Sequence, residues 1–193
     1  FALDSNYMDQ AQLKWLEEQL SRATDRWKIA FFHHPLYSSG EKHGSEMDLR
    51  SQVEPLFIKY GVDIVFAGHE HFYERIKPQN GIYYFIEGGS AKLREGNIRT
   101  NSALTARRFD IVNVFMGAEP RKDCMPFQVV SRTRKPVHSG SPPRPPAARS
   151  VWGGGPAPPA RAGGARGSPP RGARPLPPRR RGRGRRAATW CPR

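Results

Sequence analysis

The sequence predicts an α/β fold followed by a segment that does not fold, on three observations. Short β-rich apolar runs at 27–33 and 62–67 alternate with stretches of helical periodicity, an order that is typical of a layered α/β sheet. Further apolar runs between residues 82 and 130 follow one another without a helical stretch, which indicates an antiparallel portion. After Gly140 the composition changes abruptly.

The first helix is expected at about 9–22. A short apolar strand, Phe1–Asp4, precedes it. Asp9 with Gln12 three residues later resembles a capping box in which Asp takes the place of Ser or Thr. Its apolar face consists of leucines at helical spacing, which fixes the assignment: Leu13, Leu16 and Leu20.

The second helix is expected after a polar, glycine-containing loop at 36–45. Ser45 with Asp48 can cap it. Pro55 inside it should remove one backbone hydrogen bond, and Gly61 stands at the position where helices often end. The residues expected on its buried face are Leu49, Val53, Leu56, Phe57 and Tyr60.

Four strands complete the expected fold. The apolar runs 62–67 and 82–86 are separated by residues 68–81, which we expect to form a loop. Residues 107–118 and 125–130 are expected as two more strands, in a hairpin or meander. The whole order is therefore β-α-β-α-β and then antiparallel strands.

Charge and composition divide the chain into a body, 1–140, and a tail, 141–193. The net charge is +15, yet the body holds 19 basic and 17 acidic residues. The tail holds 13 Arg and no Lys, Asp or Glu, and Pro, Arg, Gly and Ala fill 44 of its 53 positions. Such a segment cannot form a core, so we expect disorder.

The tail has two interpretations. Its arginines could bind nucleic acid or other polyanions non-specifically by charge. Reading GC-rich DNA in a shifted frame would produce the same composition, and we favour this second interpretation. Elsewhere, no apolar run approaches the roughly 20 residues of a membrane span. Phe1 is not a natural start residue, so we expect the amino end to be truncated.

His69 and His71 follow the strand expected at 62–67, and are the first candidates for a functional site. Ligand sites in open α/β sheets collect at the carboxyl ends of strands, and neutral imidazole is the commonest side-chain metal ligand. In an extended segment residues i and i+2 share a face, so both rings can converge. The pair alone is better explained as two ordinary loop histidines, but Gly68 before it favours close approach to an ion.

A third histidine ends the strand expected at 27–33. Right-handed β-α-β connections can bring the carboxyl ends of two parallel strands to one edge of the sheet, and three histidines there would make a catalytic metal set. His33 and His34 compete for this place, because neighbours on a strand point to opposite faces. The pattern alone does not choose between them.

Two motifs carry a resemblance to a known family. Residues 63–75 (DIVFAGHEHFYER) resemble the last metal-binding motif of the calcineurin-like metallophosphoesterases, and the Tyr-Glu-Arg extension points to the purple acid phosphatase-like branch. Residues 33–39 (HHPLYSS) resemble the preceding motif, in which the histidine two before the proline is the ligand. This selects His33. The resemblance covers about residues 1–140 and implies part of a four-layer α/β metallophosphatase fold.

The resemblance also implies an activity, the hydrolysis of phosphoric esters. His33 and His69 would hold one of two divalent or trivalent ions (Fe, Zn or Mn) and His71 the other. A metal-bound hydroxide would attack phosphorus in line, in a small phosphoester or a phosphoprotein. His43 resembles a position that faces substrate, where it could contact a phosphate oxygen or assist the leaving group. A solvated loop histidine is nearly as good an interpretation of His43.

The sequence departs from the family in its acidic ligands. The early motifs that carry the bridging Asp and an Asn-His pair are not present, and Asp4 and Asp63 are expected to be structural. Because two metal ions need carboxylates to offset their charge, we expect weak or absent metal binding and no activity from this chain alone. The alternatives are an inactive scaffold with a nucleic-acid-binding tail and a one-metal site with another hydrolytic role. The resemblance favours export, but the sequence assigns no compartment.

Overall fold

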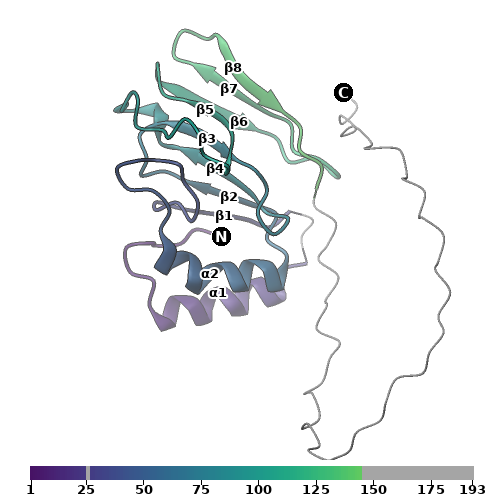
Figure 1. The fold of residues 1–193 in the computed structure, drawn as a ribbon. Helices are drawn as coiled ribbons and strands as arrows, with labels where there is room; N and C mark the ends of the chain where they lie inside the picture. Colours follow the sequence, from purple (N-terminus) through teal and green to yellow (C-terminus); the bar gives the residue numbers. More distant parts are fainter. Residues whose placement is uncertain (25–26, 145–193) are drawn as a thin grey trace, which may run out of the picture.

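The computed structural model describes residues 1–24 and 27–144. Within this part the chain forms three layers, namely a pair of helices, a five-stranded sheet and a three-stranded sheet (Figure 1). The predicted α/β class is therefore confirmed. In chain order the elements are α1 (Gln10–Arg22), β1 (Ile29–Phe32), α2 (Met47–Tyr60), β2 (Ile64–Ala67), β3 (Tyr73–Ile76), β4 (Tyr83–Glu87), a 3₁₀ turn (Gly88–Ser90), β5 (Thr105–Phe109), β6 (Val114–Ala118), β7 (Phe127–Ser131) and β8 (Pro136–Gly140).

The larger sheet is parallel at one side and antiparallel at the other. Its strand order is β1-β2-β4-β3-β5. β1, β2 and β4 run parallel, with Phe32 opposite Ala67 and Ala67 opposite Ile86, whereas β3 runs antiparallel to both β4 and β5. The three parallel strands therefore end at one edge of the sheet, which is where the candidate histidines follow β1 and β2.

Both helices cover one face of this sheet, and their limits agree with the sequence prediction. The Asp9 side chain accepts a hydrogen bond from the backbone N–H of Gln12 and caps α1. Pro55 lies within α2, and Gly61 ends α2 in the left-handed conformation, which glycine adopts without a steric penalty. The buried residues of the two helices pack on the sheet in one apolar core: Leu16, Leu20, Leu49, Val53 and Phe57.

The three-stranded sheet β6-β7-β8 packs against the opposite face. Neighbouring residues of a strand point to opposite faces, and β2 shows this directly. Val65 joins the core under the helices, whereas Ile64 joins a second core between the sheets, together with Phe127 and Val129 of β7. The central strands β2 and β4 are thus buried on both sides.

The expected helix cap at Ser45 is wrong. Glu46 stands at the N-cap of α2 and its side chain makes no capping hydrogen bond. Ser45 instead accepts a hydrogen bond from the backbone N–H of Ser38 at 3.0 Å and lies 3.3 Å from the Ser38 carbonyl oxygen. The residue therefore closes the base of the 36–45 loop rather than starting the helix.

The strands differ from the prediction in three respects. β3 lies inside residues 68–81, which were expected to form a loop, and β8 was not expected at all. The single strand expected at 107–118 is two strands, β5 and β6, which belong to different sheets. Between them Asp110 accepts a hydrogen bond from the Gly96 N–H at 2.8 Å. This bond fixes the chain at the point where it passes from the five-stranded to the three-stranded sheet.

The structure continues a little beyond the expected boundary at 140. Arg144 donates its backbone N–H to the Asp123 carbonyl oxygen at 2.8 Å, and its side chain lies 3.6 Å from the Asp63 carboxylate. The rest of the expected tail, 145–193, lies outside the described residues. Among the residues that the structure describes, neither helix is long and apolar enough to cross a lipid bilayer.

Candidate metal centre

His33 and His69 meet at the carboxyl edge of the parallel strands. His33 directly follows β1, and His69 follows β2 after Gly68. The Gly68 N–H donates to the His33 carbonyl oxygen at 3.0 Å, which ties the two strand ends together. The His69 Nδ1 and His33 Nε2 atoms then lie 3.0 Å apart, and the ring centroids 4.9 Å apart. The structure thus brings together two histidines that are far apart in the sequence.

His34 belongs to the same group. One nitrogen from each of His33, His34 and His69 lies within 4.8 Å of the others. The expectation that His33 and His34 point to opposite faces is wrong, because both follow the end of β1 and stand in a bend before Pro35. His34 is also held by Ser5, whose hydroxyl oxygen lies 2.9 Å from the His34 Nδ1 atom.

His69 has a left-handed backbone, with φ of 64°. Histidine is one of the few residues besides glycine that tolerate this conformation. The His-Glu-His segment is therefore not extended, and the shared face expected for residues i and i+2 of a strand does not explain the placement of His69 and His71. A bend positions the two rings instead.

His71 lies apart from that group of three but offers a ligand atom of its own. Its Nδ1 atom is buried and has no hydrogen-bond partner among the described residues. Its carbonyl oxygen accepts the backbone N–H of Arg94 at 3.2 Å. A buried polar atom without a partner is costly, so this nitrogen is suited to a ligand that the described residues do not provide.

His43 reaches the same edge from the loop before α2. Its ring centroid lies 4.3 Å from that of His69, and its Nε2 atom lies 2.9 Å from a guanidinium nitrogen of Arg94. His43 is exposed, so both interpretations offered for it agree with this position beside His69. The sequence analysis did not single out Arg94, because a lone arginine in a polar loop carries no motif.

His33, His69 and His71 are held in the uncharged form that binds metal. Burial, followed by the charges of His43 and the other neighbouring imidazoles, lowers the pKa of His69 to about 4. Burial also lowers the pKa of His33, with His34 as a second cause. For His71 burial comes first, followed by the positive charges of Arg94 and Lys92. At neutral pH these three rings therefore keep a lone pair available.

Glu70, between the two histidines, holds the surrounding loops. Its side chain is fully buried, and its carboxylate accepts the Gly44 N–H at 2.8 Å and the Asn97 side-chain amide at 3.0 Å. Gly44 neighbours His43, and Asn97 belongs to the segment that carries Arg94. One carboxylate thus fixes two loops against the His-Glu-His segment. No local motif indicates this role, because both partners are distant along the chain.

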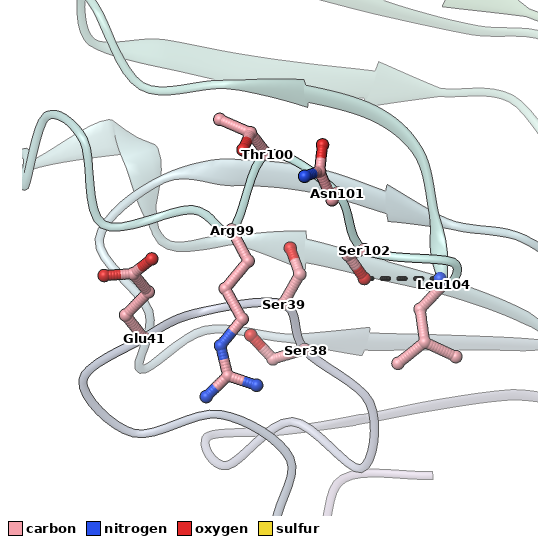
Figure 2. Close-up of a pocket in the computed structure, with 8 residues that line it drawn as sticks. All are labelled: Ser38, Ser39, Glu41, Arg99, Thr100, Asn101, Ser102 and Leu104. Carbon is pink, nitrogen blue, oxygen red and sulfur yellow. Dashed lines mark hydrogen bonds between the residues drawn. The ribbon is translucent and has the colours of Figure 1, made fainter.

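A polar cavity of about 420 Å³ lies at the base of the same loops (Figure 2). In Figure 2 the side chain of Arg99 extends past Ser39 towards Ser38. No histidine lines this cavity, so it is separate from the histidine group. Its lining residues are Ser38, Ser39, Glu41, Arg99, Thr100, Asn101, Ser102 and Leu104.

A protein-family model matches part of the chain. Residues 2–73 match the calcineurin-like phosphoesterase family. This segment contains His33, His43, His69 and His71, and over it the resemblance drawn from the sequence is confirmed.

Purple acid phosphatases are among the curated relatives of the phosphoesterase segment. The Fe(3+)-Zn(2+) purple acid phosphatase 12 of Arabidopsis thaliana is 45% identical over 82 residues, which cover 40% of this chain and 18% of that protein. The human tartrate-resistant acid phosphatase type 5 is 35% identical over 77 residues, covering 40% of this chain and 23% of that protein. The chain thus spans about a fifth of the length of these relatives.

Solved structures share the fold at low sequence identity. The purple acid phosphatase PPD1 of yellow lupin superposes with a TM-score of 0.64 at 20% identity, covering 72% of this chain and 30% of that one. GAP50 of Plasmodium, described as the anchor in the inner membrane complex, superposes with a TM-score of 0.65 at 20% identity, covering 77% and 50%. Both likenesses concern the fold alone.

The donor set fits transition-metal ions only in part. Uncharged imidazoles suit Zn and Fe, and the unpartnered His71 Nδ1 atom fits a ligand bond. Within the described residues, however, the group formed by His33, His34 and His69 contains no carboxylate. Glu70 is committed to Gly44 and Asn97. The described residues therefore offer imidazole ligands for a metal ion and, in this group, no acidic ligand.

Proposed function

We propose that this chain supplies the histidine ligands of a metal-dependent site for phosphoester hydrolysis. The convergence of His33 and His69 from two separate strand ends, in the uncharged state, carries this proposal. The match to the calcineurin-like phosphoesterases and the likeness to purple acid phosphatases support the reaction class.

Each residue has a defined role in this proposal. His33 and His69 hold one ion and His71 holds a second, through nitrogens that burial keeps unprotonated. His34, in reach of the same group, orients its neighbours through its contact with Ser5. His43 faces the substrate from the opposite loop. The ions, Fe, Zn or Mn by likeness to the relatives, would supply Lewis acidity and an activated water.

Imidazoles alone do not balance the charge of two ions, because hard, highly charged cations favour carboxylate ligands. We therefore propose that the isolated chain binds metal weakly and does not hydrolyse phosphoesters on its own. Its substrate would be a small phosphoester or a phosphoprotein, taken by a site that acidic ligands complete.

The alternative is an inactive scaffold. The same fold serves in GAP50 as an anchor, and a fold alone does not decide function. A scaffold needs no ligand at the strand ends, whereas this chain keeps uncharged histidines there and leaves the His71 Nδ1 atom unpartnered. The nucleic-acid-binding part of this alternative concerns the tail, which lies outside the described residues.

Calorimetric titration with zinc tests the proposal. We expect weak binding that disappears in His69→Asn, since asparagine keeps the left-handed backbone but removes the ring. His138→Gln is the matched control, because His138 lies outside the metal group, next to Tyr73. Zinc binding that survives His69→Asn would contradict the assignment. Tight binding of two ions would contradict the incomplete donor set.

A further inference from the structure

Arg94 is anchored beside the candidate metal ligands by its backbone. Its N–H donates to the His71 carbonyl oxygen at 3.2 Å, and its own carbonyl oxygen accepts the Asn97 N–H at 3.3 Å. The position of the Arg94 backbone is therefore fixed relative to His71, although Arg94 itself stands in a connecting segment without a long helix or strand.

The Arg94 side chain turns towards the site. Its Nη1 atom donates to the Nε2 atom of His43 at 2.9 Å. A guanidinium can only donate hydrogen bonds, so the Nε2 atom of His43 must carry a lone pair. The ring proton of His43 then sits on Nδ1. This assignment follows from the donor chemistry of arginine and makes a definite tautomer part of the geometry.

The loops that carry His43 and Arg94 are fastened to each other. The Asn97 carbonyl oxygen accepts the Glu41 N–H at 2.8 Å, and the Asn97 side chain accepts the Lys42 N–H at 3.2 Å. The same side chain donates to the buried Glu70 carboxylate at 3.0 Å. Arg94 and His43 are therefore presented together, as one rigid unit, over the His-Glu-His segment.

The described residues give Arg94 no carboxylate partner for an ion pair. Among the residues that the structure describes, no carboxylate lies within ion-pair distance of its guanidinium. Only one of its N–H donors is engaged, by a nitrogen acceptor. A half-buried arginine without a counter-charge is suited to an anionic ligand.

We propose that Arg94 binds a phosphate oxygen of the substrate, with His43 as the acceptor that aims its guanidinium at the site. A planar guanidinium fork matches two oxygens of one phosphate, so the ligand class is a phosphoryl group with at least two free oxygens. This inference rests on the proposed function for its location beside the metal ligands. A purely structural Arg94 would link the two loops without contributing to anion binding.

Inorganic phosphate tests the inference on the full chain, titrated with and without zinc and followed by the ³¹P resonance. Arg94→Gln removes the charge and the fork. Arg99→Gln is the matched control, since it removes one charge from the same segment at the separate cavity of Figure 2. We expect phosphate affinity to fall roughly tenfold or more in Arg94→Gln, as for a lost charged hydrogen bond. Arg99→Gln should stay within about twofold of the unmodified chain.

Equal losses in both variants, no loss in Arg94→Gln, or no phosphate binding by the unmodified chain under either condition would overturn the inference. The His43 tautomer is a second readout, observed by ¹⁵N NMR of the ring. We expect Nδ1–H in the unmodified chain and in Arg99→Gln, and a shift towards Nε2–H in Arg94→Gln. An Nε2–H ring in the unmodified chain would also refute the geometry. If zinc binding fails while Arg94 still governs phosphate affinity, only the metal proposal falls.

Discussion

The carboxylate of Glu70 fills the space that a side chain at position 40 would need. A Cβ atom built on Gly40 would lie far inside contact distance of the Glu70 Oε1 atom. Gly88 shows the same relationship from the other side, because a Cβ there would strike the Glu70 carbonyl oxygen. The residue between the two candidate ligands is thus enclosed by two glycines, and neither can be enlarged without moving it.

We therefore expect Gly40→Ala to destabilise the fold by about 1–3 kcal/mol, the usual cost of forcing an extra methyl group into a packed site. Gly117→Ala is the control, because no atom lies within 4 Å of a Cβ at that position. Urea denaturation of both variants provides the measurement. Equal urea midpoints for the two variants would contradict this prediction, because they would show that the Glu70 side chain moves aside at little cost in stability.

Glu70→Gln should free the loop that carries His43. An amide in place of the carboxylate cannot accept hydrogen bonds on both of its former oxygens, so either Gly44 or Asn97 loses its partner, at a cost of about 1–3 kcal/mol. Hydrogen exchange measures this locally, and we expect faster exchange of the Gly44 amide.

Glu74→Gln is the matched variant for that experiment. Glu74 is also buried and accepts the Ser39 N–H at 3.0 Å, so exchange should rise at Ser39 and not at Gly44. If both variants accelerate the same amides, the two carboxylates act as one structural cluster and Glu70 has no separate role.

Stability should fall on acidification, partly through His138. Burial, followed by the charges of Arg75 and Arg107, lowers the pKa of His138 to about 4. The unfolded chain takes up a proton near the ordinary histidine value of about 6.5, whereas the folded chain does not until about pH 4. Folding therefore weakens between these values. In His138→Phe the dependence of the urea midpoint on pH between 6.5 and 4 should become shallower, and an unchanged dependence would contradict this.

Glu87 should act in the opposite direction. Burial raises the pKa of Glu87 to about 8, while the unfolded chain releases this proton near the ordinary value of about 4.3. Its contribution is thus complete in acid and is lost as the pH rises towards 8. Above about pH 6.5, where His138 no longer titrates, the urea midpoint should fall with pH in the natural chain and stay level in Glu87→Gln. A parallel fall in both proteins would exclude Glu87 as the cause.

Regular patterns in the sequence predicted the parts of the fold that depend on local order. α1, α2, β1, β2 and β4 all carry a clear periodicity or an apolar run. β3 does not, because its central residues include Glu74, which is polar and yet buried in a hydrogen-bond network with Ser39 and Thr105. Burial of a charged residue depends on partners far along the chain, and no local pattern contains them.

The candidate site shows the same division. His33, His69 and His71 carry recognisable motifs, and the places of His33 and His69 at the strand ends follow from the parallel pairing of β1 and β2. Arg94 does not, because its contacts with His43 and His71 depend on how a connecting segment folds back. His34 was misplaced because the rule of alternating faces was applied beyond the last residue of β1.

The left-handed backbone at position 69 limits which amino acids can stand there. Glycine, asparagine, aspartate and histidine tolerate this conformation, and β-branched residues do not. Of these four only histidine brings an imidazole. A single change to asparagine or glycine would leave the bend and the sheet edge intact while removing one imidazole from the histidine group. In descendants of this chain, one substitution is therefore enough to remove a candidate metal ligand without changing the fold.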